Sequence, residues 1–357
     1  MKKSCHRILE MVKIRNKEKN FSICIGLLIT CFIVWIVSSF PFLNKPRDNI
    51  NNPLKYDNQR PLNPGRYEGI YLNAILRDCG QLCNTSRKGS PGPYFDHVTA
   101  PIDCLALFKN DYIDLGHGKP RAPKAMPPEL KDEYTMGGRI QLIKAYYSDI
   151  YLGRTKSIPV WTVKNVDNLI RLAKEGKLGG TYGTKDTNEL RDALKHTPGI
   201  KNARVLVIGS TSPWVEACVL EAGAKEIVTL EYGTINSKHP QLKTMVPLEF
   251  RNSYLNNTLG TFDVIVTYSS VEHSGLGRFG DMLNPWGDII TIARAWCVTK
   301  DGGSLTIGVP YNYEHELIRF NADRRYGKFR YPYLVTNWKQ HYEGHGVQNP
   351  HVFTKVA

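Results

Sequence analysis

From Ala203 onward the chain alternates between short apolar runs and stretches with helical spacing, and this pattern constrains the fold more than any other feature. The apolar runs are ARVLVI, EIVTL, FDVIVTY, SLTIGV and HVFTKV, at residues 203–208, 226–230, 262–268, 304–309 and 351–356. Residues 214–224 and 289–297, which lie between runs, have helical spacing. Apolar strands that alternate with helices predict a mostly parallel sheet with helices on both faces.

Three further helices are expected upstream, over residues 138–150, 165–177 and 186–196. In the first, Ile140, Ile143 and Tyr147 fall on one helical face. The third opens with an acidic cap at Asp186 and ends before a Pro-Gly pair, as a helix should. We therefore expect an N-terminal extension with helices over residues 67–185 and the α/β domain over residues 186–357.

The segment 21–43 carries no charged side chain. About 20 helical residues span the hydrocarbon core of a bilayer, so the segment predicts a transmembrane helix. Its apolar core is longer than the ~7–15 residues of a cleaved signal peptide, the alternative reading. It is also followed by Phe40, Pro41, Phe42 and Leu43 instead of small residues at a cleavage site. A retained signal anchor fits better.

The charge of the flanking residues predicts the orientation of this helix. Seven basic and two acidic side chains precede it, whereas few basic residues follow. The positive-inside rule then keeps residues 1–20 in the cytoplasm as a basic tail. Residues 44–66, rich in Asn and Pro, form a stem. The expected protein is a single-pass type II membrane protein of the Golgi or ER with its bulk in the lumen.

The formal charge of +14 is the one unusual figure of the composition, and a charge of this size suggests nucleic-acid binding. The basic tail contributes +5 of this charge, and the remainder is spread without a basic block. A lumenal domain would also not meet nucleic acid. We expect no nucleic-acid partner.

Two sequons agree weakly with a lumenal placement: Asn84-Thr85-Ser86 and Asn256-Asn257-Thr258. Past the predicted span the five cysteines are Cys79, Cys83, Cys104, Cys218 and Cys297, an odd number that leaves at least one thiol unpaired. The first three lie close enough in sequence for a local disulfide. A metal site or simple packing is the alternative for the Cys-x3-Cys pair.

Polar residues collect where the predicted strands end, which is where open parallel sheets bind ligands. The first strand ends in Gly209-Ser210-Thr211, a turn whose backbone amides a ligand can approach. The second ends in Glu231, about 22 residues after Gly209. An acidic residue at this distance suits the two hydroxyls of an adenosine ribose. The third strand runs into a Gly-rich loop that contains Glu272 and His273.

The segments KNARVLVIGSTSPWVEACVLEAGAKEIVTLEY, FDVIVTYSSVEHSGLGRFGDMLNPWGD, DGGSLTIGVP and FNADRRYGKFRYP resemble an uncharacterised domain family that is expanded in nematodes. That family is similar to class I S-adenosylmethionine-dependent methyltransferases, and the resemblance covers roughly residues 130–357. It implies a Rossmann-like seven-stranded sheet whose last strand runs antiparallel, with S-adenosylmethionine as the cofactor. One departure is that only Gly209 stands where methyltransferases commonly have several glycines.

The resemblance implies that the turn takes the methionine part of the cofactor and Glu231 the ribose. The expected cofactor-binding residues are Gly209, Ser210, Thr211, Glu231, Tyr232, Tyr268 and Ser269. A sugar hydroxyl is a poor nucleophile at neutral pH, so methyl transfer to it needs a general base. His273 is the first candidate base, and Glu272 or Asp281 would orient or replace it; Asp288 is a weaker fourth. Expected on the acceptor side are Glu314, His315, Asn321, Asp323 and Arg324.

Topology and fold together predict a lumenal O-methyltransferase that acts on a glycan sugar hydroxyl, such as that of a fucose. The first alternative is an inactive methyltransferase fold kept as a lumenal binding or scaffold protein. A glycosyltransferase is a weaker alternative, since these enzymes commonly need an Asp-x-Asp motif and the sequence has none. The spacing of His341, His345 and His351 fits no strong metal motif, so no metal is expected.

Overall fold

A computed structural model describes residues 102, 104–109, 123–144, 147–148 and 157–356. The predicted tail, transmembrane helix and stem (residues 1–66) lie outside these residues, as do Cys79, Cys83 and the first lumenal sequon. Within the described part of the chain, no helix combines the length and the apolar character that a membrane span requires. The transmembrane helix therefore stays a prediction.

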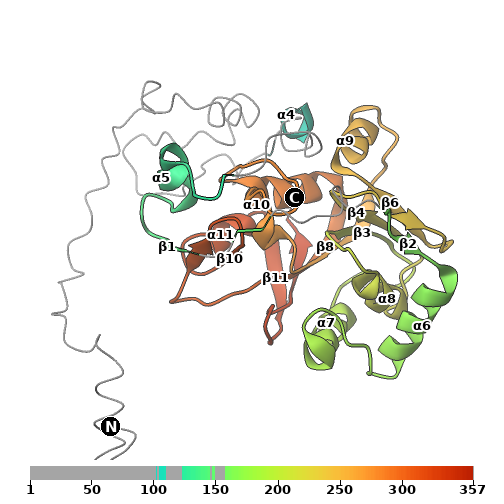
Figure 1. Ribbon diagram of the computed structural model, residues 1–357. Coiled ribbons are helices and arrows are strands. Elements are labelled where there is room, and N and C mark those ends of the chain that lie inside the picture. The colour runs from blue at the N-terminus through green and yellow to red at the C-terminus, as the bar shows by residue number, and fades with distance from the viewer. Residues whose placement is uncertain (1–101, 103, 110–122, 145–146, 149–156, 357) are drawn as a thin grey trace, which may run out of the picture. The chain divides into compact units, whose positions relative to one another are not determined.

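The core of the fold is a mixed sheet of seven strands (Figure 1). In spatial order the strands are β11 (Trp338–Glu343), β12 (His351–Lys355), β8 (Thr299–Gly308), β7 (Phe262–Tyr268), β3 (Arg204–Ile208), β4 (Glu226–Leu230) and β6 (Leu242–Met245). The strands from β8 to β6 pair in parallel, and β12 runs antiparallel to both of its neighbours. The predicted α/β sheet with an antiparallel last strand is confirmed.

Helices cover both faces of the sheet, as the apolar strands required. Val205 and Val207 of β3 pack into the cluster formed with α6 (Val163–Lys174), α7 (Gly183–Lys195) and α8 (Trp214–Glu221). Leu206 and Ile208, on the opposite face, pack with α4 (Cys104–Lys109), α9 (Pro247–Leu255) and α10 (Gly287–Val298). Figure 1 shows α4 and α9 on one side of the sheet and α6, α7 and α8 on the other.

The remaining elements are short and lie around this core. They are η6 (Pro128–Leu130), α5 (Lys131–Tyr134), β1 (Gln141–Ile143), β2 (Val160–Trp161), β5 (Asn236–Ser237), η8 (Val271–His273), β9 (Leu317–Arg319), β10 (Asp323–Arg325) and α11 (Tyr331–Leu334). Strand β9 pairs with β1 and β10, and β2 pairs with β5. The small β1–β9–β10 sheet carries two charged residues of the site described below.

Most of the predicted elements occur at the predicted places, but the helix expected over residues 138–150 does not. Gly137 and Gly138 have positive φ angles of 71° and 82°, and residues 141–143 form β1 instead of a helix. Ile140 is buried, as its helical face suggested. Pairing with β9, which lies far along the chain, outweighs the local helical spacing.

Two strands of the main sheet, β6 and β11, were not predicted from the sequence. Both are edge strands with few buried side chains, so neither shows the apolar run that marks a central strand. Their place in the sheet follows from backbone pairing to β4 and β12.

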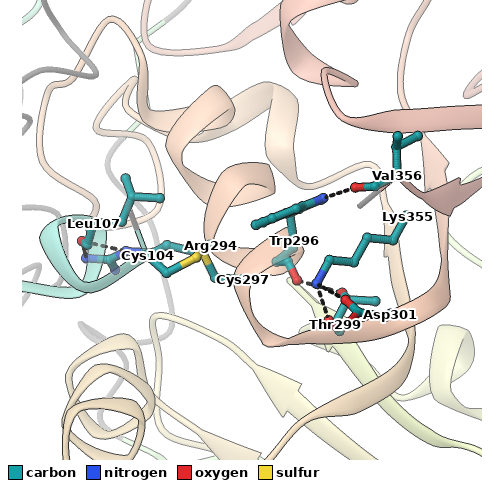
Figure 2. The surroundings of a disulfide bond; sticks show 10 residues. Cys104, Leu107, Arg294, Trp296, Cys297, Thr299, Asp301, Lys355 and Val356 are labelled. Carbon is teal, nitrogen blue, oxygen red and sulfur yellow. Dashed lines mark hydrogen bonds and ion pairs between the residues drawn. A yellow bond between two sulfur atoms is a disulfide. The ribbon is translucent and has the colours of Figure 1, made fainter. Parts of the chain in front are cut away.

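A disulfide joins α4 to the end of α10, linking Cys104 to Cys297 across 193 residues (Figure 2). Of the three clustered cysteines, Cys104 is therefore not available for a local bridge, because it is paired with Cys297; a local bridge between Cys79 and Cys83 stays a prediction, since both lie outside the described residues. Beside the bond, the Arg294 guanidinium donates to the Leu107 carbonyl, with Nη2 at 2.9 Å from the oxygen. Cys218 is a buried free thiol, which agrees with the predicted unpaired cysteine.

Replacing either cysteine of the bridge should destabilise the fold. We expect Cys104→Ser and Cys297→Ser each to lower the free energy of unfolding by about 2–4 kcal/mol, because the open chain regains conformational entropy in the unfolded state. The double variant should lose no more than either single variant, since all three lack the same bond. Denaturant unfolding measures these losses, and additive losses would contradict the pairing.

Candidate active site

The site lies where two neighbouring parallel strands send their connections to opposite faces of the sheet. After β3 the chain crosses through α8 to β4, and after β7 it crosses through α10 to β8. Open α/β sheets bind ligands at such a switch point, beyond the carboxyl ends of the strands. A cavity of about 780 Å³ occupies this position, a volume within the usual range of small-molecule sites.

The cavity contains the residues that the sequence singled out for the cofactor. All seven line it: Gly209, Ser210, Thr211, Glu231, Tyr232, Tyr268 and Ser269. His273 and Asp281 line it as well, so one cavity joins the predicted cofactor residues to two of the candidate bases. The structure thus places these nine residues around one cavity, while their roles in cofactor binding and catalysis stay predictions.

The turn after β3 depends on Gly209. Its φ of 74° belongs to the left-handed region, and a Cβ at this position would lie 1.7 Å from Oγ of Ser270. The Gly209 amide also donates to the carbonyl of Leu230 at 2.8 Å. The turn is therefore packed tightly between the ends of β7 and β4.

Glu231 faces this turn from the end of β4. Its carboxylate accepts from the backbone amides of Ser210, at 3.0 Å, and Tyr232, at 2.8 Å. Burial raises the pKa of Glu231, and these two hydrogen bonds oppose the rise. A carboxylate has about four lone-pair positions, so two accepted amides leave room for ribose hydroxyls.

The other side of the cavity near Glu231 is apolar, lined by Ile208, Leu230, Pro247 and Phe250. An apolar wall beside a carboxylate and a turn with small hydroxyl side chains suits an adenosine with a charged tail. The residues present therefore fit S-adenosylmethionine, with Glu231 at the ribose and the Ser210–Thr211 turn at the polar end.

His273 ends η8 on the Gly-rich loop. Its Nδ1 lies 2.5 Å from the carbonyl oxygen of Ala322. Because a carbonyl can only accept, Nδ1 carries the hydrogen, and Nε2 of the neutral ring keeps a lone pair. Nε2 lies 3.7 Å from Oε1 of Glu272. This arrangement equips Nε2 to take up a proton beside a carboxylate.

Glu272 stands behind His273 and is almost fully buried. Its Oε1 accepts from the Ser269 hydroxyl at 2.8 Å, and that hydroxyl lies 2.6 Å from the Tyr182 hydroxyl. Ser269 has a positive φ of 51°, a strained conformation that sets its side chain between these two groups. Burial raises the pKa of Glu272, although the nearby imidazole of His273 opposes the rise.

Tyr182 is a site residue that the sequence analysis missed. It lies in the stretch Gly179-Gly180-Thr181-Tyr182-Gly183, immediately before the first residue of α7 and upstream of the segments that carry the family resemblance. Its side chain lines the cavity together with that of Thr181. The three glycines of this stretch are the sequence signal that could have marked it as a close-packed loop.

The Asp281 carboxylate binds backbone amides of its own loop. Its two oxygens accept from the amides of Gly277, at 3.0 Å, and Phe279, at 3.1 Å. Burial raises the pKa of Asp281 despite these bonds. Both oxygens are thus engaged in shaping the loop, which makes Asp281 a weaker base candidate than His273.

Asp288, the fourth candidate, lies fully buried at the start of α10. Its carboxylate meets the guanidinium groups of Arg330, at 2.6 Å, and Arg324, at 3.6 Å, and accepts from the Tyr326 hydroxyl at 2.9 Å. Burial alone would raise the pKa of Asp288, but the two guanidinium groups hold it below its ordinary value. Asp288 is therefore committed to a buried ion cluster and does not line the cavity.

Of the residues expected on the acceptor side, Asp323 lines the cavity and forms an ion pair with Arg319. Arg324 lies in the buried ion cluster, where it also donates to the carbonyl of Ser274 at 2.6 Å. Asn321 is buried, whereas Glu314 and His315 are exposed and lie outside the cavity lining. Of the five residues expected to contact the methyl acceptor, only Asp323 therefore lines the cavity.

The C-terminal histidines do not gather into a site. His351 is buried, with Nδ1 at 2.6 Å from the Tyr331 hydroxyl, while His341 and His345 are exposed. Among the described residues, no group of three or more His, Cys, Asp or Glu side chains is placed to hold a metal ion.

Comparison with known proteins agrees with the resemblance noted in the sequence. Residues 202–353 match the family described as Caenorhabditis protein of unknown function, DUF268. Among curated proteins, none matches. Solved structures similar to this one include the N-methyltransferase NodS from Bradyrhizobium japonicum, 13% identical with a TM-score of 0.33, which covers 48% of this chain and 95% of its own.

An O-methyltransferase family 2 protein from Planctomyces limnophilus is also similar, at 13% identity and a TM-score of 0.32, over 54% of this chain and 62% of its own.

Two alanine variants test how tightly the Gly209 turn is packed. Gly209 and Gly199 share a φ of 74°, but nothing lies within 4 Å of a Cβ built at Gly199. Gly199→Ala should cost about 1–2 kcal/mol of unfolding free energy from backbone strain alone. Gly209→Ala should cost a further ~1–3 kcal/mol because its methyl group meets Ser270. Equal losses in denaturant unfolding would argue against the close contact.

Residues 202–353 thus match the model of the nematode family, and the seven-stranded sheet with its antiparallel last strand is the α/β arrangement that the resemblance in the sequence implied.

Proposed function

We propose that this protein is an S-adenosylmethionine-dependent O-methyltransferase that faces the lumen of the Golgi or ER and methylates a sugar hydroxyl of a glycan. One observation carries the proposal: a single cavity is lined by both Glu231, the expected ribose ligand, and His273, the expected base, whose Nδ1 is engaged by the Ala322 carbonyl. A fucose or another terminal sugar is the expected acceptor.

The bound cofactor would supply an electrophilic methyl group. The chain itself must hold the acceptor hydroxyl against that group and remove its proton. Nε2 of His273 keeps the lone pair for this task, since Nδ1 donates to Ala322. The imidazolium that forms would lie 3.7 Å from Glu272, whose carboxylate stabilises the positive charge in a buried setting.

The lumenal placement has support from two described features. The Cys104–Cys297 disulfide is a bond typical of proteins in oxidising compartments. Asn256 of the second sequon is exposed at the end of α9, with Thr258 exposed beside it, so a glycan could be accommodated there. The membrane anchor itself rests on the sequence alone.

Cofactor binding is the first test, because it needs no known acceptor. We expect isothermal calorimetry to detect S-adenosylhomocysteine binding to the full-length protein, and Glu231→Ala to weaken it about tenfold or more through loss of charged hydrogen bonds. Glu226→Ala is the matched control, since Glu226 begins the same strand and pairs with Lys243 at the surface. Wild-type protein that binds no ligand would favour the inactive scaffold.

Methyl transfer is the second test. His273→Gln should slow it by about 10²–10⁴-fold while leaving S-adenosylhomocysteine binding unchanged, because the general base acts only on the acceptor. His341→Gln, at an exposed position of β11, is the control. Glycans from cells that express each variant are compared by mass spectrometry. Each methyl group transferred raises the mass of a glycan by that of one CH₂ unit. Full methylation with His273→Gln would exclude His273 as the base.

A further inference from the structure

Glu216 lies directly beneath the predicted cofactor site and is completely buried in the first turn of α8. Its Oε2 lies 2.9 Å from the hydroxyl of Ser210, and its Oε1 lies 2.8 Å from the hydroxyl of Thr229. Ser210 belongs to the turn after β3, and Thr229 stands two residues before Glu231 in β4. The carboxyl group of Glu216 thus ties together the two segments that carry the predicted cofactor residues.

Counting hydrogens around Ser210 shows which form of Glu216 fits. The Ser210 hydroxyl has one hydrogen but two acceptors at 2.9 Å, the Ser212 carbonyl and Oε2 of Glu216. An ionised Glu216 leaves one of these contacts without a hydrogen. A neutral Glu216 donates from Oε2 to Ser210, which then donates to Ser212, while Thr229 donates to Oε1. The neutral acid alone satisfies all three contacts.

The surroundings of Glu216 favour the same form. Burial raises the pKa of Glu216 from 4.5 to about 7, and the nearby negative charge of Glu231 adds to the rise. On its own helix, Glu216 interacts electrostatically with the buried thiol of Cys218. From the facing helix α7, Arg191 pairs with Glu221 and not with Glu216. Helix α6 meets α8 through apolar side chains.

We propose that Glu216 is a positioning residue which, as a neutral carboxylic acid, holds the Ser210 turn in the shape that binds the cofactor, so that loss of its proton weakens binding. The neutral acid fixes the Ser210 hydroxyl, and the Ser210 amide in turn donates to Glu231. This chain lacks the several glycines common at this turn, and the buried acid would define its shape instead. The binding part of this inference rests on the proposed function.

The affinity of the full-length protein for S-adenosylhomocysteine, measured by calorimetry from pH 6 to pH 8, tests the inference. Wild-type affinity should fall by up to about tenfold over this range as Glu216 loses its proton. Glu216→Gln should stay as tight as wild type at pH 6, because its amide donates to Ser210 and accepts from Thr229 without titrating. Glu221→Gln, on the same helix, should follow wild type.

A second measurement needs no ligand. The folded protein holds the Glu216 proton up to about pH 7 and the unfolded chain releases it near pH 4.5, so the contribution of Glu216 to wild-type stability falls as pH rises between these values. Glu216→Gln has no such loss, and its thermal unfolding midpoint should rise relative to wild type across this window. Parallel midpoints would overturn the neutral-acid assignment.

The two measurements separate this inference from the proposed function. Wild-type protein that binds S-adenosylhomocysteine with the same pH dependence as Glu216→Gln would overturn the inference alone. Absence of binding at every pH would overturn the proposed function, and the role of Glu216 in binding with it.

Discussion

The parallel pairing of β3 with β7 is the constraint on which the rest of the site depends. Because the chain leaves these neighbouring strands toward opposite faces, their carboxyl ends stay uncovered and a cavity remains between them. The Gly209 turn, Glu231 and the loop with His273 all enter this space from strand ends. Rigid strands thereby bring together residues that lie more than sixty positions apart in the sequence.

A buried ion cluster supports the loop on the other side of the cavity. Asp288, Arg324 and Arg330 are each almost fully buried, and Arg324 donates to backbone carbonyls of Glu272 and Ser274. Breaking such a pair leaves an uncompensated buried charge, which costs a protein several kcal/mol. The cluster therefore fixes the backbone around His273. Asp288, which the sequence offered as a candidate base, thus belongs to the cluster that supports His273, the first candidate base.

Much of the site was predictable because strand ends are visible in a sequence. An apolar run that stops at Gly209 or before Glu231 marks the position where a ligand can bind, and the fold then brings those positions together. Tyr182 and Glu216 escaped prediction for physical reasons. Tyr182 reaches the cavity from a loop outside the main pattern, and Glu216 looked like an ordinary polar residue of a helix until its complete burial was seen.

The sequence by itself determined the parallel α/β core, since an apolar run can be buried on both faces only between layers of helices. It also determined the polar residues at the strand ends. Only the tertiary structure decided which distant segments meet: Cys104 with Cys297, β1 with β9, and Tyr182 with Ser269. These contacts join residues that are far apart in the sequence and meet only in the folded chain. The local pattern of apolar and polar residues therefore does not indicate the partner of a cysteine, an edge strand or a hydroxyl group.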